Sequence, residues 1–205
     1  MAGFGAVSAV GKSIERLLNA AFLAEQPISD ALPTTAVLVR TEDFDPTNAA
    51  VSIPQQGLTI FLYRVDFNKT MRAAWSAVGS VDGKAHLPLD LHYLLTAWAP
   101  NAEHEHLIVG RTMQVLETTP IFSGPLLYPA DPTVQTAEWK PNEAIQLLLE
   151  EIPTEALMRI FDSLPGDYKL SVPYIARVVR VESRVAEPAP PVTTSAIGVK
   201  PEAMP

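Results

Sequence analysis

Cysteine is absent from all 205 residues of this chain, which excludes disulfide bonds, thiolate nucleophiles and cysteine-ligated metal sites. Positive charge is also scarce: 15 lysines and arginines stand against 23 acidic residues, which leaves a formal net charge of −8. Nucleic acids and anionic membranes bind basic surfaces, so neither is an expected partner. No uncharged apolar run reaches the roughly eighteen residues that span a bilayer, and the N-terminus lacks the charge order of a signal peptide. We therefore expect a soluble protein that is made and assembled in the cytoplasm.

The composition divides the chain into two unequal parts. Hydrophobic residues make up 47% of the sequence, which is enough for one domain with a buried core, predicted over residues 1–184. Residues 185–205 contain five prolines, no hydrophobic period and only scattered apolar side chains, namely Val192, Ile197 and Val199. Such a segment cannot bury enough surface to offset the entropy of ordering it. We expect a flexible, proline-rich tail that becomes ordered on assembly.

The strongest periodicity lies between Leu87 and Trp98. Every second position carries a large apolar side chain: Leu87, Leu89, Leu91, Tyr93 and Leu95. This period of two is typical of a strand with one buried face. Leu94 and Trp98 lie on the opposite face, so both faces are expected to be covered and the strand to be central.

Weaker patterns predict the remaining elements. Helices are expected over residues 8–25, from the end of a polar break at 100–103 to about 118–119, and from 154 to 164. Strands are expected over 34–41, 58–67, 142–151 and 172–183. The buried stripe of the second helix is predicted to consist of His106, Val109, Met113 and Leu116. Residues 142–151 also have a helix-like start, but their alternation favours a strand. The pattern as a whole indicates an α/β domain.

Two motifs resemble ligand-binding sites but are better explained as ordinary parts of helices. Residues 6–13 resemble a phosphate-binding loop with alanine at its first glycine, but too few residues precede them for the strand that such a loop requires. Glu103-His104-Glu105-His106 places its histidines two apart, about 200° around a helix, whereas a helical zinc site needs them four apart. We expect no metal and no cofactor.

The remaining polar and aromatic candidates are sparse. Asp90 and His92 share one strand face and could act as a base with its orienting acid, but no suitable nucleophile is evident. Buried, hydrogen-bonded polar groups are the simpler interpretation. Trp75 lies beside Arg72 in an irregular segment, and exposed tryptophan–arginine pairs often anchor protein interfaces. Arg72 and Trp75, together with the apolar tail residues Val192, Ile197 and Val199, are the predicted partner-contacting residues.

Several segments together resemble one known family. They are residues 87–98 (Leu-Pro-Leu-Asp-Leu-His-Tyr-Leu-Leu-Thr-Ala-Trp), 105–116, 61–65, 68–72 and 168–174. The chain from about Val10 to Glu182 resembles the N-terminal domain of the cap, or tail-terminator, proteins of extracellular contractile injection systems. These systems are phage-tail-like particles such as the antifeeding prophage and the Photorhabdus virulence cassette. The tail and the proline-rich segment 123–141 match poorly or not at all.

The resemblance implies a tail-terminator-like fold with a mixed, mostly antiparallel sheet flanked by two or three helices. It implies a homo-hexameric ring at the end of the particle far from the baseplate. There the ring would end the inner tube, anchor the last sheath ring and leave the cell with a released particle. The implied partners are the tube protein, the sheath protein and further copies of this chain, with no small-molecule substrate and no catalysis.

Two other functions stay open on the sequence alone. One is a ligand-binding or hydrolytic enzyme in which Asp90, His92 and His104 line a pocket. The other is a soluble assembly adaptor.

Overall fold

The computed structural model describes residues 3–29, 32–72, 85–129 and 139–182. The helices are α1 Ala6–Ala24, α2 Lys69–Arg72, α3 Ala102–Thr118 and α4 Thr154–Asp162, with short 3₁₀ turns η1 Thr41–Phe44 and η3 Gly124–Leu126. The strands are β1 Thr35–Val39, β2 Gly57–Phe67, β3 His86–Trp98, β4 Ile121–Ser123, β5 Ala144–Leu149 and β6 Ser171–Glu182.

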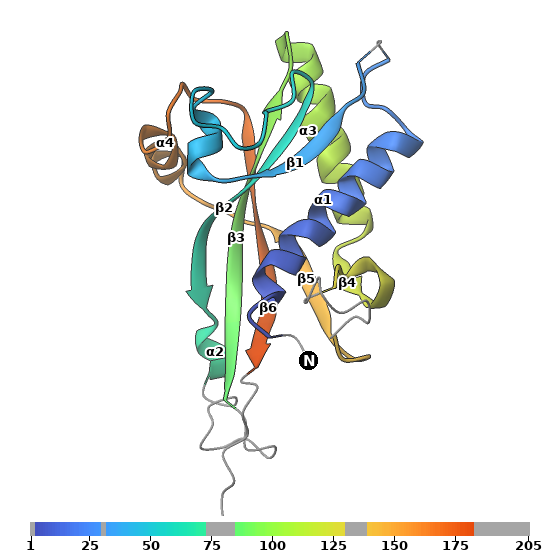
Figure 1. Ribbon diagram of the computed structural model, residues 1–205, viewed down its shortest axis with the longest axis vertical. Coiled ribbons are helices and arrows are strands. Elements are labelled where there is room, and N and C mark those ends of the chain that lie inside the picture. Colours follow the sequence, from blue (N-terminus) through green and yellow to red (C-terminus); the bar gives the residue numbers. More distant parts are fainter. Residues whose placement is uncertain (1–2, 30–31, 73–84, 130–138, 183–205) are drawn as a thin grey trace, which may run out of the picture.

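All six strands form one sheet in the order β1-β2-β3-β6-β5-β4. β1 runs parallel to β2, and the other neighbours are antiparallel. The predicted mixed, mostly antiparallel sheet is therefore confirmed, as is the central position of β3 (Figure 1). The strand predicted over 142–151 is also confirmed, because residues 144–149 form β5.

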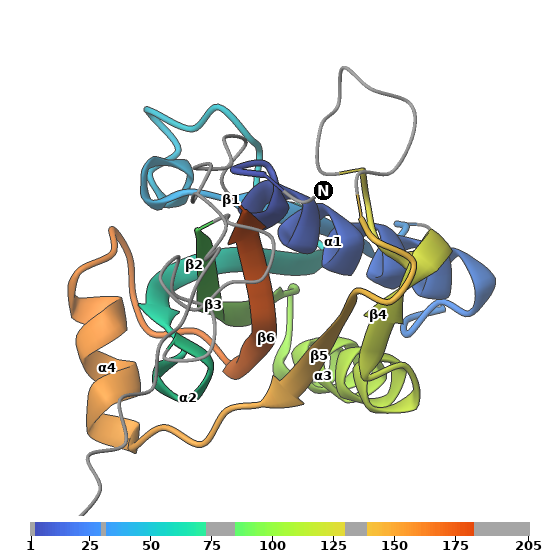
Figure 2. The same cartoon turned by 90° about the horizontal axis from the view of Figure 1, so that it is seen from below.

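Helices cover the two faces of the sheet unequally. The larger apolar core joins α1 and α3 to one face, through Val10, Ile14 and Ile108 on the helices and Leu91 and Tyr93 on β3. A smaller cluster lies on the other face, where α4 and η1 pack over Phe61 and Leu94. Figure 2 shows α4 on the side of the sheet away from α1 and α3. Three helices thus flank the sheet, as the family resemblance implied.

α1 also covers the outer edge of β1. The Asn19 amide donates to the carbonyl oxygen of Ala36 at 2.8 Å and accepts from its N–H at 2.9 Å. Glu15 accepts from the N–H of Leu38 at 3.1 Å. These side chains satisfy backbone groups that would otherwise face solvent along an edge strand. The residues that resemble a phosphate loop, 6–13, lie inside this helix.

The stripe predicted for α3 is only partly correct. Leu116 is buried and Val109 packs against the core, but His106 is exposed. The buried residues of α3 are Ile108, Thr112, Val115 and Leu116. Apolar residues lie on several sides of this helix, and Leu107 is 45% exposed. A weakly amphipathic helix does not define its own buried face, so packing on the sheet decides it.

Two irregularities interrupt the alternation of side chains. The β2–β3 register shifts between Leu62 and Arg64, and the β3–β6 register shifts between Leu89 and Leu91. Ala176 pairs with Leu91 and Val179 pairs with Leu89, so β6 contains one residue more than β3 between these two pairs. Strict alternation along β6 would place Ile175 on the same face as Val179, but Tyr174 shares the larger core with Val179 instead. An extra residue at a bulge moves every later side chain to the other face.

Gly57 is required where β2 begins. A Cβ atom at this position would lie 2.2 Å from the carbonyl oxygen of Thr35 and 2.6 Å from Pro54 Cγ. Gly57→Ala should lower the free energy of unfolding by about 1–3 kcal/mol, because the parallel β1–β2 pair must separate to admit the methyl group. Urea denaturation measures the change.

Gly110 in α3 is the matched control. A Cβ atom there meets nothing within 4 Å. Gly110→Ala should raise stability by about 0.5–1 kcal/mol through helix propensity. Equal effects of the two substitutions would contradict the close β1–β2 approach.

Glu182 is a buried acid at the end of β6. Its side chain is 1% exposed and accepts from Lys140 Nζ at 2.8 Å and Arg180 at 2.6 Å. Burial acts to raise the pKa of Glu182, but the Lys140 hydrogen bond and the neighbouring positive charges outweigh it and lower that pKa overall. The stabilising contribution is therefore complete above the pKa of the unfolded chain, about 4.3, and is lost as the pH falls through the lower folded-state value.

Glu182→Gln should cost about 1–3 kcal/mol of unfolding free energy at pH 7. The difference from the parent should shrink once the pH is below the folded-state pKa, because both side chains are then uncharged. Guanidinium denaturation between pH 3 and 7 measures this. Glu155→Gln is the control: Glu155 forms an ion pair with Arg159, but its side chain is 77% exposed, so solvent screens the pair and stability should hardly change.

Candidate functional site

His92 lies on β3 and is only 4% exposed. Its Nδ1 lies 2.8 Å from Glu150, which follows β5, and its Nε2 lies 3.4 Å from Asp66 on β2. The Tyr63 hydroxyl donates to Glu150 at 2.9 Å. Arg64 lies 3.2 Å from Glu150 and 3.1 Å from Asp66. This polar cluster therefore ties together three segments that are distant in sequence.

Opposite charges lie side by side in this cluster. The Glu150 and Asp66 carboxylates face Arg64, and His92 lies between them. Burial raises the pKa of Tyr63 far above its usual value, helped by its hydrogen bond to Glu150. Tyr63 is therefore a neutral hydrogen-bond donor and not a base at physiological pH. Each group has a structural partner, as expected for buried polar side chains.

Asp90 and His92 share a strand face, as predicted, but they do not form a catalytic pair. The Asp90 carboxylate accepts from Asn68 Nδ2, with both distances 3.2 Å. Asp90 and His92 line one hollow of about 390 Å³. Among the described residues that line it, Thr70 alone carries a hydroxyl, and His92 bonds to Arg64 and Glu150 rather than to a hydroxyl. The acid thus orients an amide, and no hydroxyl of the described residues is bonded to the imidazole.

His104 does not join that hollow. It lies in the first turn of α3, where its backbone N–H donates to Asn101 Oδ1 at 2.9 Å. Glu105 in the same turn lies 3.8 Å from Lys169. Acids in a first turn match the positive end of the helix dipole. Over the described ranges, no group of three or more His, Asp or Glu side chains is arranged to hold a metal ion.

Of the five predicted partner-contacting residues, the structure describes Arg72 alone. Arg72 is exposed at the end of α2, and its guanidinium carbon lies 4.6 Å from the centre of the Phe67 ring. Arg72 therefore stacks on an aromatic ring of β2. Trp75, Val192, Ile197 and Val199 lie outside the described residues.

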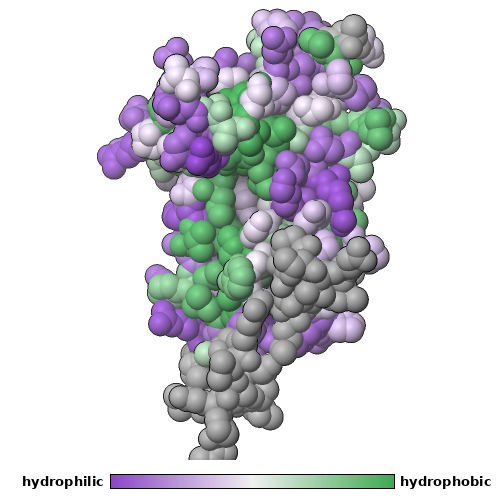
Figure 3. Space-filling view, in the orientation of Figure 1, coloured by the Kyte–Doolittle hydropathy of each residue, from purple (hydrophilic) through white to green (hydrophobic). Residues whose placement is uncertain are grey.

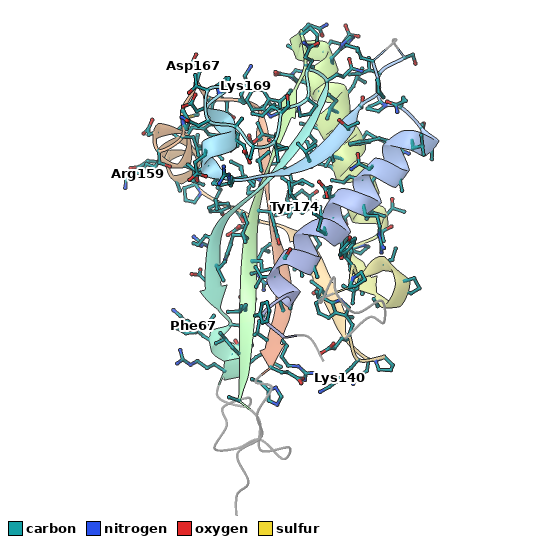
Figure 4. The ribbon with its side chains drawn as sticks, viewed as in Figure 1. Phe67, Lys140, Arg159, Asp167, Lys169 and Tyr174 are labelled. Carbon is teal, nitrogen blue, oxygen red and sulfur yellow. The ribbon has the colours of Figure 1, made fainter. Side chains whose placement is uncertain are left out.

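An apolar surface lies beside Arg72. Val65 and Phe67 of β2 are 47% and 44% exposed, and Leu87 of β3 is 45% exposed. We call these three residues the arm patch. They lie on the same face of the sheet as α1, but beyond the part of that face that α1 covers. Figure 3 shows an apolar band over β2 and β3, and Figure 4 places Phe67 at the lower end of β2, away from α1. Clustered exposed apolar residues of this kind are typical of protein contacts.

The sequence contained a partial signal for the arm patch. In β2 one face turns charged at Arg64 and Asp66, while Val65 and Phe67 stay apolar on the other. A strand that leaves the core would normally become polar on both faces. Their exposure depends on where α1 ends over the sheet, and local periodicity does not report that.

Trp98 and Trp139 are packing residues. Trp98 Nε1 donates to Thr59 at 3.0 Å, and Trp139 Nε1 donates to the carbonyl oxygen of Tyr128 at 2.6 Å. Trp98 also lines a hollow of about 400 Å³ with Phe44, Phe161 and Lys169.

Over the described ranges, no helix is long and apolar enough to cross a membrane.

The fold resembles two solved tube terminators. One is the sheath/tube terminator of an extracellular contractile injection system, PVC, in the extended state; the TM-score is 0.53 at 19% identity, over 96% of this chain and 64% of that chain. The other is the tube-terminating cap of the anti-feeding prophage; the TM-score is 0.54 at 17% identity, over 93% of this chain and 60% of that chain. The chain thus spans less than two thirds of either relative. At these identities the likeness concerns the fold.

No curated protein matches the chain. Residues 9–195 match the family described as the Pvc16 N-terminal domain. This match confirms the resemblance predicted from residues 87–98 and their neighbours. Because the match covers nearly all of the sequence, the chain belongs to the Pvc16 N-terminal domain family.

Proposed function

We propose that this protein is a structural cap that ends the tube of a contractile injection system. The observation that carries the proposal is the likeness of 96% of the chain to a sheath/tube terminator, together with family membership over residues 9–195. The polar groups agree with a role without chemistry, because His92, Glu150 and Asp90 are engaged in structural contacts. A cap acts through surfaces, and the arm patch offers one.

The cap is proposed to be a homo-hexameric ring. Rings close through heterologous contacts, in which the front of one copy meets the back of the next. One side of the ring would bind the last ring of inner tube protein, and its rim would hold the last ring of sheath protein. No substrate, cofactor or metal takes part. Assembly would occur in the cytoplasm, and the cap would leave with the particle.

The proline-rich tail is proposed to make one of these contacts. Residues 185–205 would order on assembly by adding a strand to a sheath subunit or a neighbouring cap. Val192, Ile197 and Val199 would supply its apolar contacts, and Arg72 and Trp75 would contribute further partner contacts.

Two alternative functions make different demands. A hydrolytic enzyme would use the hollow lined by Asp90 and His92, so substitution of His92 would abolish its activity. A soluble adaptor would be absent from finished particles. A cap stays at the end of the particle, and neither its location nor its effect on tube length needs an imidazole.

Removal of the gene should give particles with overlong or uncapped tubes, because nothing would stop tube growth. Negative-stain electron microscopy of purified particles measures tube length and the state of the ends. Expression of the full chain in the same strain should restore uniform capped ends, and labelled protein should lie at the end opposite the baseplate.

His92→Gln is the matched variant for this experiment. The glutamine amide can keep a hydrogen bond to Glu150, and it cannot act as a general base. It should restore capping as well as the parent does. Normal particles from the deletion strain, or a failure of well-folded His92→Gln to complement, would contradict a purely structural cap.

Truncation after residue 184 should weaken capping without unfolding the domain, because the apolar core residues that the structure describes all lie before this point. We expect sheathed particles with irregular distal ends by electron microscopy, while the thermal unfolding midpoint of the purified protein stays within a few degrees of the parent. Normal, fully capped particles would show that the tail makes no required contact.

A further inference from the structure

The lower half of β2, Leu62–Phe67, is an open edge of the sheet. β1 pairs only with Gly57–Phe61. Within the described part of the chain, no strand lies outside the remaining six residues of β2. Figure 1 shows this half of β2 continuing below β1 towards α2.

The β2–β3 register shows which backbone groups face outward. The N–H of Asn68 donates to the carbonyl oxygen of Pro88 at 2.9 Å, and the same register pairs Asp66 with Asp90. In an antiparallel pair, directly bonded residues alternate with residues whose N–H and C=O point away. Val65 and Phe67 therefore direct their N–H and C=O groups away from β3, as a further strand would require.

The other edges are less open. Side chains of α1 already satisfy Ala36 and Leu38 on the outer side of β1. β4 has only three residues and runs directly into η3. Among the described strands, the lower half of β2 is thus the longest edge left for pairing.

The charges on this half of β2 do not block the edge. Arg64 and Asp66 pair with each other at 3.1 Å, and Arg64 also reaches Glu150, which lies across the sheet. These side chains are held over the face opposite the arm patch. Val65 and Phe67 occupy the arm-patch face, where a neighbouring strand would cover their exposed surface.

A suitable donor lies in the part of the sequence that the structure does not describe. Residues 192–199 read Val-Thr-Thr-Ser-Ala-Ile-Gly-Val, a run rich in β-branched residues between Pro191 and Pro201. Ile197 and Val199 are two residues apart, which is also the spacing of Val65 and Phe67. Nine residues separate this run from the end of β6 at Glu182, and they can span up to about 30 Å.

We propose that residues 192–199 of one copy pair, as an added strand, with Leu62–Phe67 of the next copy. Ile197 and Val199 then lie beside Val65 and Phe67 as cross-strand neighbours. The choice of a second copy rests on the proposed ring, because a head-to-tail ring needs one donor and one acceptor surface on each subunit. Each copy thereby gives its tail to one neighbour and receives a tail from the other.

The absence of cysteine makes this pairing directly testable. Full-length Val65→Cys and Ile197→Cys chains are mixed, assembled into particles and treated with a short thiol crosslinker. We expect a crosslinked dimer at least tenfold above background. Leu149→Cys replaces Val65→Cys in the control: Leu149 is a strand residue that is 53% exposed on β5, and it should give only background.

The outcomes separate this inference from the proposed function. Capped particles without the dimer would overturn the strand pairing and leave the cap function intact. A crosslink found only within single chains that carry both cysteines would mean that the tail returns to its own edge, which also overturns the proposal. Uncapped wild-type tubes would instead contradict the cap function.

Val65→Pro provides a second test. Proline removes the outward N–H of residue 65 but no bond between β2 and β3, and edge strands tolerate such a change. With Phe67→Cys as the acceptor position, Val65→Pro should reduce the crosslink to Ile197→Cys at least tenfold. Val65→Thr keeps the N–H and the branched shape, and it should crosslink like the parent. Unchanged crosslinking of folded Val65→Pro would overturn the proposal.

Discussion

Burial of β3 on both faces, with a hydrogen-bonded strand on each side, is the constraint on which the domain depends. Leu91, Tyr93 and Leu95 contribute to the core under α1 and α3, while Leu94 packs with the cluster under α4. Both helical layers are therefore positioned by one strand. The same strand holds His92 against Glu150 and carries Leu87 out to the arm patch. Core, polar cluster and exposed arm are successive parts of one continuous element.

Strong periodicity made much of this fold predictable. The alternation in β3 and the wide apolar stripe of α1 each admitted one interpretation, and the structure agrees with both. α3 was predicted as a helix, but its buried face was predicted only in part, because apolar residues lie on several of its sides. Strict alternation does not hold along β6, because its bulge arises from pairing with β3 and leaves no local mark in the sequence. β4, with three residues, was too short to show a period.

The candidate site was harder to predict, for a related physical reason. Local spacing correctly placed Asp90 and His92 on one face. Their actual partners, Asn68 and Glu150, come from elsewhere in the sequence and are brought close only by sheet pairing. The arm patch depends in the same way on where α1 stops. Family resemblance supplied the functional interpretation, because the cap role proposed for this chain depends on contact surfaces, and local sequence patterns do not mark these.

The two hydrogen bonds between the Asn19 side-chain amide and the Ala36 backbone affect how copies of this chain can pair their sheets. The amide imitates the peptide group of a neighbouring strand, so the outer edge of β1 is satisfied without a further strand. Another chain could pair with Ala36 and Leu38 only if the Asn19 and Glu15 side chains first withdrew. Contact between copies through the β1 edge is therefore disfavoured, however high the local concentration of the chain becomes.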